Sequence, residues 1–128
     1  MLLCDHAQVA NGKLYVLGGG WTTVATPDSP IPVALAVVLM VDWTATNEKH
    51  QLLTKLIDDD GQPVELGGIP IQNGGEFEVG RPPGTKAGSA ITQPMVFKFE
   101  GLPLPAGGYV FELTVDDEVL ARTPFRVG

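Results

Sequence analysis

The chain has 128 residues, enough for one domain with one hydrophobic core, which we expect to span residues 1–128. Its 15 acidic and 8 basic residues give a formal charge of −7, and no stretch concentrates the basic ones. Because nucleic acids and anionic membranes would repel such a chain, we expect neither as a partner.

Glycine and proline are scattered between short apolar runs, which is typical of many short strands joined by turns. Residues 2–9 and 14–17 flank Asn11-Gly12, a pair that favours the type I′ turn of a β-hairpin. Three glycines at 18–20 then indicate a bend, and residues 21–25 a short strand. The start of the chain therefore predicts all-β structure.

The stretch from Pro32 to Trp43 predicts the central strand. All residues from 33 to 41 are apolar, so we expect the strand to be covered on both faces. A membrane-spanning helix needs roughly 18 apolar residues, and this run is about half as long. We expect the hydrophobic core to form around it.

The segment from His50 to Asp58 allows two interpretations. Its apolar residues have helical spacing, and Thr46 or Asn47 could cap a helix. However, the segment runs into a tight-turn sequence at residues 58–61, and residues 63–66 resemble a returning strand. We favour a strand, and the helix stays the alternative.

The last third of the chain predicts further strands after a long loop. Residues 76–79 form a short strand, and residues 80–89 form the loop. Phe97 and Phe99 then point inward from a strand at residues 95–100. A final hairpin turns at Asp116-Asp117, and its first strand alternates outward and inward residues from 109 to 115.

This hairpin resembles the last hairpin of immunoglobulin-like and fibronectin-like sandwiches, in which a Gly-x-Tyr run enters the penultimate strand. Gly107, Gly108 and Tyr109 are the matching residues. The resemblance implies that Tyr109 hydrogen-bonds back across a corner of the chain. We therefore expect an immunoglobulin-like, antiparallel β-sandwich of roughly seven to nine strands, with a β-barrel as the alternative.

Three segments also resemble a family of small uncharacterised bacterial proteins, a domain of unknown function. They are AQVANGKLYVLGGGW at 7–21, FEVGRPPG at 77–84 and RTPFRV at 122–127. The resemblance implies an all-β fold and a bacterial, intracellular setting, and it implies no catalytic residue.

Two motifs with possible chemistry fail on spacing. Residues 80–86 lack the spacing of a phosphate-binding loop, and Pro82 and Pro83 remove N–H groups that such a loop needs. The acidic run at 58–61 does not fit a calcium-binding loop, because positions 56 and 67 are leucine and glycine. We expect no nucleotide, metal or other cofactor.

The lone Cys4 cannot form an internal disulfide, and residues 1–20 lack the pattern of a signal peptide. A reducing cytoplasm fits best. Cys4, His6 and His50 leave too few ligands for a zinc site, so we expect Cys4 to be buried and inert. The sequence also contains no Gly-x-Ser-x-Gly nucleophile elbow.

We therefore predict a non-enzymatic module that contacts another protein or its own copies through a loop end or an exposed sheet edge. The loop end would present Trp21, Arg81, Pro82 and Pro83; Trp21 could equally be a core residue, and for Trp43 the core is the simpler interpretation. Two alternatives remain. One is a small-ligand binder or weak enzyme with a pocket between the sheets near His6, His50 and Tyr109, and the other is a subunit of a larger homo-assembly.

Overall fold

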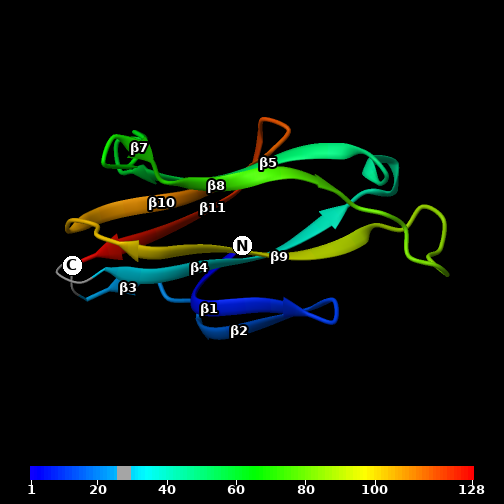
Figure 1. The fold of residues 1–128 in the computed structure, drawn as a ribbon, viewed down its shortest axis with the longest axis horizontal. Helices are drawn as coiled ribbons and strands as arrows, with labels where there is room; N and C mark the ends of the chain where they lie inside the picture. The colour runs from blue at the N-terminus through cyan, green and yellow to red at the C-terminus, as the bar shows by residue number, and fades with distance from the viewer. Residues whose placement is uncertain (26–29) are drawn as a thin grey trace.

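Two β-sheets bury their apolar faces against each other in the computed structural model, which describes residues 1–25 and 30–128 (Figure 1). The first sheet has the order β2-β1-β4-β9, with bounds β1 (Leu2–Ala10), β2 (Lys13–Gly19), β4 (Ile31–Val41) and β9 (Ile91–Leu102). The second has the order β3-β11-β10-β5-β8, with bounds β3 (Thr23–Val24), β5 (Lys49–Asp58), β8 (Gln72–Glu78), β10 (Gly107–Val115) and β11 (Glu118–Val127). The predicted sandwich is confirmed.

Three of the eleven strands in the described part of the chain contain only two residues. They are β3 and the small hairpin of β6 (Glu65–Leu66) and β7 (Ile69–Pro70). β3 lies within the short strand expected at residues 21–25 and β6 within the one expected at 63–66, whereas β7 has no counterpart among the expected strands. All named pairs of strands are antiparallel except β3 and β11, which are parallel. The immunoglobulin-like type of sandwich stays a prediction.

The core is one layer of inward-facing side chains between the sheets. Phe111 lies at its centre and is fully buried, with ring centroids 5.0 Å from Phe99 and 5.6 Å from Phe125. Tyr109 stacks on Phe125, and its hydroxyl donates to the Pro105 carbonyl at 2.7 Å. The predicted alternation of β10 and the hydrogen bond of Tyr109 across the corner are thus both confirmed.

The central strand β4 is covered on both faces over only part of its length. Its outer-facing Ala34 and Ala36 are buried beneath the hairpin of β1 and β2, which forms a third layer in Figure 1. Farther along the same face, the exposed fractions of Val38 and Met40 are 53% and 71%. The expectation of full coverage was therefore wrong for this end of β4.

Proline explains why the hairpin leaves the sheet. β1 pairs with β4 only where Leu2 to Cys4 lie opposite Ala36 to Ala34. In this register His6 would next face Pro32, which has no N–H to continue the ladder. β1 keeps its pairing with β2, and the two strands turn beneath β4 and β9 together.

Two turns confirm the predictions made for them. Asn11 and Gly12 have φ of 52° and 70°, and Asp116 and Asp117 have φ of 50° and 66°, values that suit tight hairpin turns. Residues 50–58 lie within strand β5, so the helical alternative was wrong.

Two expected strand ends were misplaced. Trp43 lies outside the central strand in the 3₁₀ turn η1 (Trp43–Ala45). The expected return strand at residues 63–66 reaches β5 only through a bridge from Pro63 to Ile57, and β6 pairs with β7 instead. The described part of the chain has this single helical turn and contains no helix that could span a membrane.

Candidate functional site

A groove of about 240 Å³ opens between the end of β4 and the turn that joins β10 to β11. We call it the His50 groove. Its walls are mostly apolar, with carboxylates and one imidazole among them; the lining residues are Leu39, Met40, Val41, Asp42, Ala45, His50, Phe77, Val115, Asp116, Glu118 and Leu120.

The groove opens where both sheets leave strand edges unpaired. β1 pairs with β4 no farther along than Ala36. On the opposite sheet, β11 pairs with β3 only at Arg126 and Val127, so its first residues form a second unpaired edge within the described structure. The sandwich is therefore open on this side.

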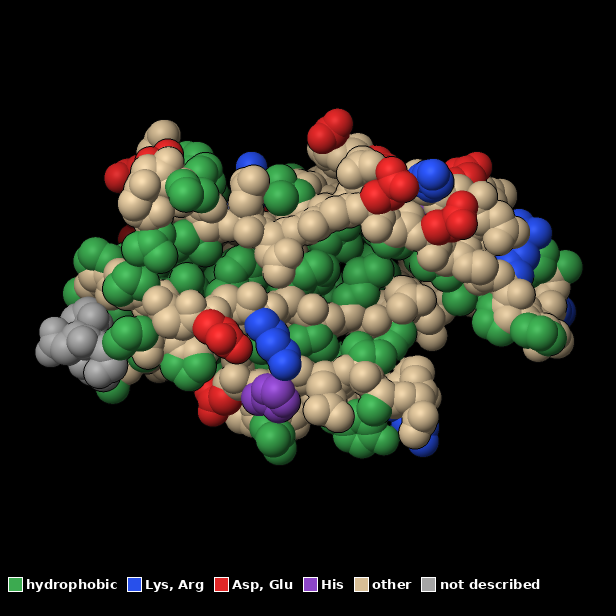
Figure 2. Space-filling view, in the orientation of Figure 1, with side chains coloured by type: hydrophobic (Ala, Val, Ile, Leu, Met, Phe, Trp, Pro, Cys, Tyr) green, Lys and Arg blue, Asp and Glu red, His purple; other side chains and the backbone are tan. Residues whose placement is uncertain are grey.

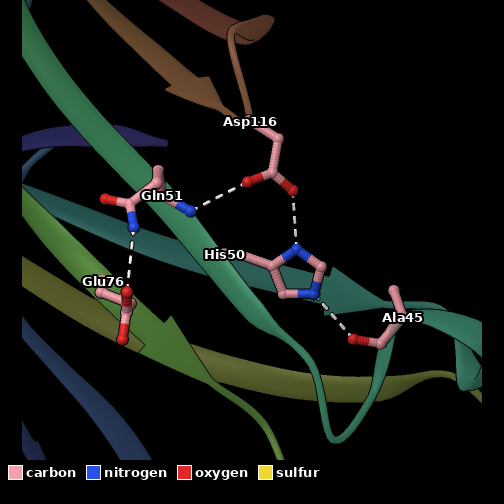
Figure 3. A network of polar contacts seen from close by, with 5 residues as sticks. All are labelled: Ala45, His50, Gln51, Glu76 and Asp116. Carbon is pink, nitrogen blue, oxygen red and sulfur yellow. Dashed lines mark hydrogen bonds and ion pairs between the residues drawn. The ribbon is translucent and has the colours of Figure 1, made fainter.

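His50 lies near the start of β5 and lines the groove. Both of its ring nitrogens make hydrogen bonds (Figure 3). Nδ1 lies 2.7 Å from Asp116 Oδ2, and Nε2 lies 2.7 Å from the carbonyl oxygen of Ala45. Both partners are acceptors, so the geometry fits an imidazolium that donates from both nitrogens. The pKa of His50 is raised, first by the Ala45 carbonyl and then by the Asp116 carboxylate.

Asp116 is held by the neighbouring strand as well as by His50 (Figure 3). Its Oδ1 accepts a hydrogen bond from the backbone N–H of Gln51 at 2.9 Å. The backbone N–H of Asp116 donates to the backbone carbonyl of Gln51 at 2.8 Å. The Gln51 N–H, followed by His50, lowers the pKa of Asp116. Gln51 also donates to Glu76 at 3.1 Å, which extends the polar network to β8.

Arg81 stabilises the η1 turn through two hydrogen bonds and a stacking contact. Its Nε donates to Thr46 Oγ1 at 2.6 Å, and Nη2 donates to the Trp43 carbonyl at 2.8 Å. The guanidinium carbon lies 3.7 Å from the centre of the Trp43 ring, a cation–π arrangement. The turn is thus tied to His50 through Ala45 and to Arg81 through Trp43 and Thr46.

The hydrogen bonds of His50 limit the chemistry that its ring can perform. Both nitrogens of His50 are used in hydrogen bonds, so its ring has no lone pair free to act as a general base. The lining contains no serine, threonine, cysteine or lysine. Among residues 1–25 and 30–128, no three histidine, cysteine or acidic side chains gather as metal ligands.

Trp21 and Arg81, predicted to share one loop end, lie at opposite ends of the sandwich. Trp21 packs edge-on against Phe125 at 6.0 Å and lies near Ile31, where β4 begins. Arg81 stacks on Trp43, beyond the end of β4. Because β4 runs the length of the sandwich between them, the common binding end was wrong.

Trp21 is half-buried against the core, while Trp43 lies outside the core cluster beneath Arg81. The simpler expectation for Trp43, a core position, was therefore wrong. Pro82 and Pro83 are exposed on the loop between β8 and β9, which extends beyond the end of the sandwich (Figure 1). Their role in binding stays a prediction.

His6, His50 and Tyr109 do not form one pocket. His6 is exposed on β1 and lies near Asp5, Lys98 and Glu100 on the outer side of the first sheet. Tyr109 pairs with Asp58 at the far end of β5, whereas His50 lies at its start. The sequence could not show this separation, because it depends on strand register and on the hairpin leaving the sheet.

Cys4 is fully buried, and its thiol donates to the Ala34 carbonyl at 3.5 Å. Burial, followed by the charge of Asp5, raises the pKa of the thiol. The predicted burial of Cys4 is confirmed. Because a neutral thiol is a poor nucleophile, the raised pKa also lowers the reactivity of its sulfur.

Asp116, which the sequence analysis placed only in a turn, Val38 and Met40 are site residues that it missed. Val38 and Met40 lie at the open edge of β4. They stand in a uniformly apolar run, so nothing in their own residue types separates them from core positions such as Leu39. Their exposure is decided by the register of β1, in which Leu2 lies opposite Ala36 and the strand runs toward Ala34, away from Val38.

Among curated proteins and among solved structures, no match to the chain is found. The sequence pattern of a family described as "Family of unknown function (DUF6941)" matches residues 1–128, the whole chain. The predicted resemblance to a family without an assigned function is confirmed, whereas a bacterial origin stays a prediction. The chain belongs to the DUF6941 family of unknown function.

Proposed function

We propose that this protein is a non-enzymatic binding module that contacts another protein, or its own copies, through the exposed edge of a sheet. The observation that carries the proposal is the unpaired end of β4, where Val38 and Met40 are exposed beside the His50 groove. Unpaired strand edges are sites at which proteins add a strand from a partner.

The surroundings of this edge support a binding role. The η1 turn, β5 and the β10–β11 turn are tied together by His50, Asp116 and Arg81. A preorganised groove loses little conformational entropy when a partner is bound. The apolar walls would supply the area that the partner covers.

A photo-crosslinking residue at position 40 would test the proposal in the cells that make the protein. We expect a discrete covalent adduct after illumination, because Met40 points away from the core at the unpaired edge. Leu17 is similarly exposed, at 66%, but lies on β2 away from the groove, and it provides the matched control.

The mass of the adduct identifies what is bound. A different protein or a second copy of this chain at position 40 would each support the proposal. An adduct at position 17 with none at position 40 would move the binding surface elsewhere, and no adduct at either position would contradict the proposal.

A further inference from the structure

The backbone of β4 shows which of its groups face the unpaired edge. The Gly20 amide donates to the Leu3 carbonyl at 2.8 Å, so the backbone polar groups of Leu3 face β2. Because these groups alternate in direction along a strand, those of Leu2 and Cys4 face β4.

The partners of Leu2 and Cys4 on β4 are Ala36 and Ala34. In the same alternation, Val38 and Met40 direct their N–H and C=O groups toward the same side. No strand in the described parts of the chain pairs with them there. The edge therefore offers two donors and two acceptors to an added strand.

The length of this edge defines the kind of segment that fits. Residues 37–41 span roughly 16 Å in an extended conformation, which matches about five residues of a partner. One face of the added strand would lie toward Leu39 and Leu120 in the groove, and the other would lie beside Met40. Apolar residues at alternate positions of the added strand would pack against the apolar walls of the groove.

The charges around the groove favour a cationic occupant. Three carboxylates line it, from Asp42, Asp116 and Glu118, against one basic side chain, that of His50. Asp116 is paired with His50, and none of the ion pairs found among the described residues includes Asp42 or Glu118. A second copy would bring the same net charge of −7, so another protein is the better match.

From the free edge, the apolar walls and the negative charge, we infer that the His50 groove binds an extended, lysine- or arginine-containing segment of another protein. The segment adds a strand along residues 37–41. This inference rests on the proposed binding function and names the chemistry of the partner.

Three synthetic peptides of nine residues would test it with the whole chain. The first alternates valine with lysine and threonine, the second has glutamate in place of lysine, and the third is the lysine peptide with methylated backbone nitrogens on the pairing side. Fluorescence anisotropy measures affinity, and amide hydrogen exchange followed by NMR locates the bound peptide.

We expect the lysine peptide to bind at least about tenfold more tightly than the glutamate peptide at low salt, with the difference shrinking as salt is added. The methylated peptide should bind weakly, because it cannot donate to the edge. Binding should slow exchange of the Val38 and Met40 amides.

A matched pair of charge reversals tests the location. Glu118→Lys should weaken binding of the lysine peptide about threefold to tenfold, because it replaces an attractive charge at the groove. Glu65→Lys, at an exposed position on β6, makes the same change in net charge and should leave the affinity unchanged.

Equal affinity for the lysine and glutamate peptides, or no binding of either, would overturn the inference. Binding that leaves the Val38 and Met40 amides unprotected would do the same, as would concentration-dependent self-association that blocks the edge. A crosslinked partner at position 40 without a preference for lysine would overturn this inference alone, since crosslinking does not depend on charge.

Discussion

His50 joins residues that are far apart in the chain, and its charge is part of that connection. Asp116 is 66 positions away in sequence, and Ala45 precedes the strand that carries His50. Both contacts accept hydrogen bonds, so a neutral ring can satisfy only one of them as a donor.

The stability of the protein should therefore depend on pH through this residue. The pKa of His50 is raised above 6.5, so its stabilising effect is complete below pH 6.5 and is lost as the pH rises through the raised value. The pKa of Asp116 is lowered below 3.8, so its effect is complete above that pH and is lost at more acidic pH. We expect this network to contribute most between these limits.

His50→Gln tests this prediction. At a pH within that range the substitution should cost about 1 kcal/mol of unfolding free energy, because a charge-assisted hydrogen bond is lost. In alkaline solution the cost should be smaller, since the wild-type ring is then neutral. Urea unfolding of the wild type and of His50→Gln, at a pH within that range and in alkaline solution, measures this cost. A cost that is the same at both pH values would contradict the prediction.

Cys4 should react slowly with thiol reagents in the folded protein. The side chain is fully buried, and its thiol has a raised pKa, so little thiolate is exposed. We expect reaction with a disulfide reagent near neutral pH at least about a hundredfold more slowly than in the denatured chain. Absorbance of the released thiol measures the rate, and a native rate close to the denatured one would show that Cys4 is accessible.

At the scale of single elements, β8 depends on the absence of a side chain at one position. A Cβ added to Gly74 would collide with the backbone carbonyl oxygen of Leu52 on β5, whereas a Cβ at Gly75 would meet nothing within 4 Å. The two glycines are adjacent in the same strand, so they form a matched pair.

Gly74→Ala should destabilise the protein by roughly 1 to 3 kcal/mol, because β8 must move away from β5. Gly75→Ala should change the stability by less than about 0.5 kcal/mol. Urea unfolding curves of the two variants provide the comparison. Equal effects would mean that the spacing between β5 and β8 does not depend on Gly74.

At the scale of the whole molecule, the hairpin layer and the main sandwich are held by cores of different size. Among the residues that the structure describes, the buried cluster between the hairpin and β4 has four members, whereas the cluster between the sheets has nineteen. The space-filling view shows that core as apolar side chains visible between the two layers (Figure 2). The hairpin should therefore open at a lower free energy than the sandwich.

Amide hydrogen exchange should show this difference. We expect the amides between His6 and Leu17 to exchange faster than those in the middle of β5 and β10, which should report on global unfolding. Ala36→Leu enlarges a buried side chain beneath the hairpin and should speed hairpin exchange further. Uniform exchange across hairpin and sandwich would show that all three layers unfold together.

The sequence by itself determined the features that arise within a few residues. Asn11-Gly12 and Asp116-Asp117 specify turns because these residues tolerate positive φ, and alternation along β10 specifies its buried face. Tyr109 and its hydrogen bond to Pro105 also lie within one local motif. The sandwich and the family resemblance could therefore be predicted.

Only the tertiary structure decided where the candidate site lies. Arg81 meets Trp43 across 38 positions, and Asp116 meets His50 across 66, so neither contact follows from local spacing. The exposure of Met40 depends on the register of β1, which pairs with β4 no farther along than Ala36, although the residue type of Met40 resembles that of its buried neighbours. Local sterics and periodicity define the strands, but register and layer packing decide which strand edge stays open.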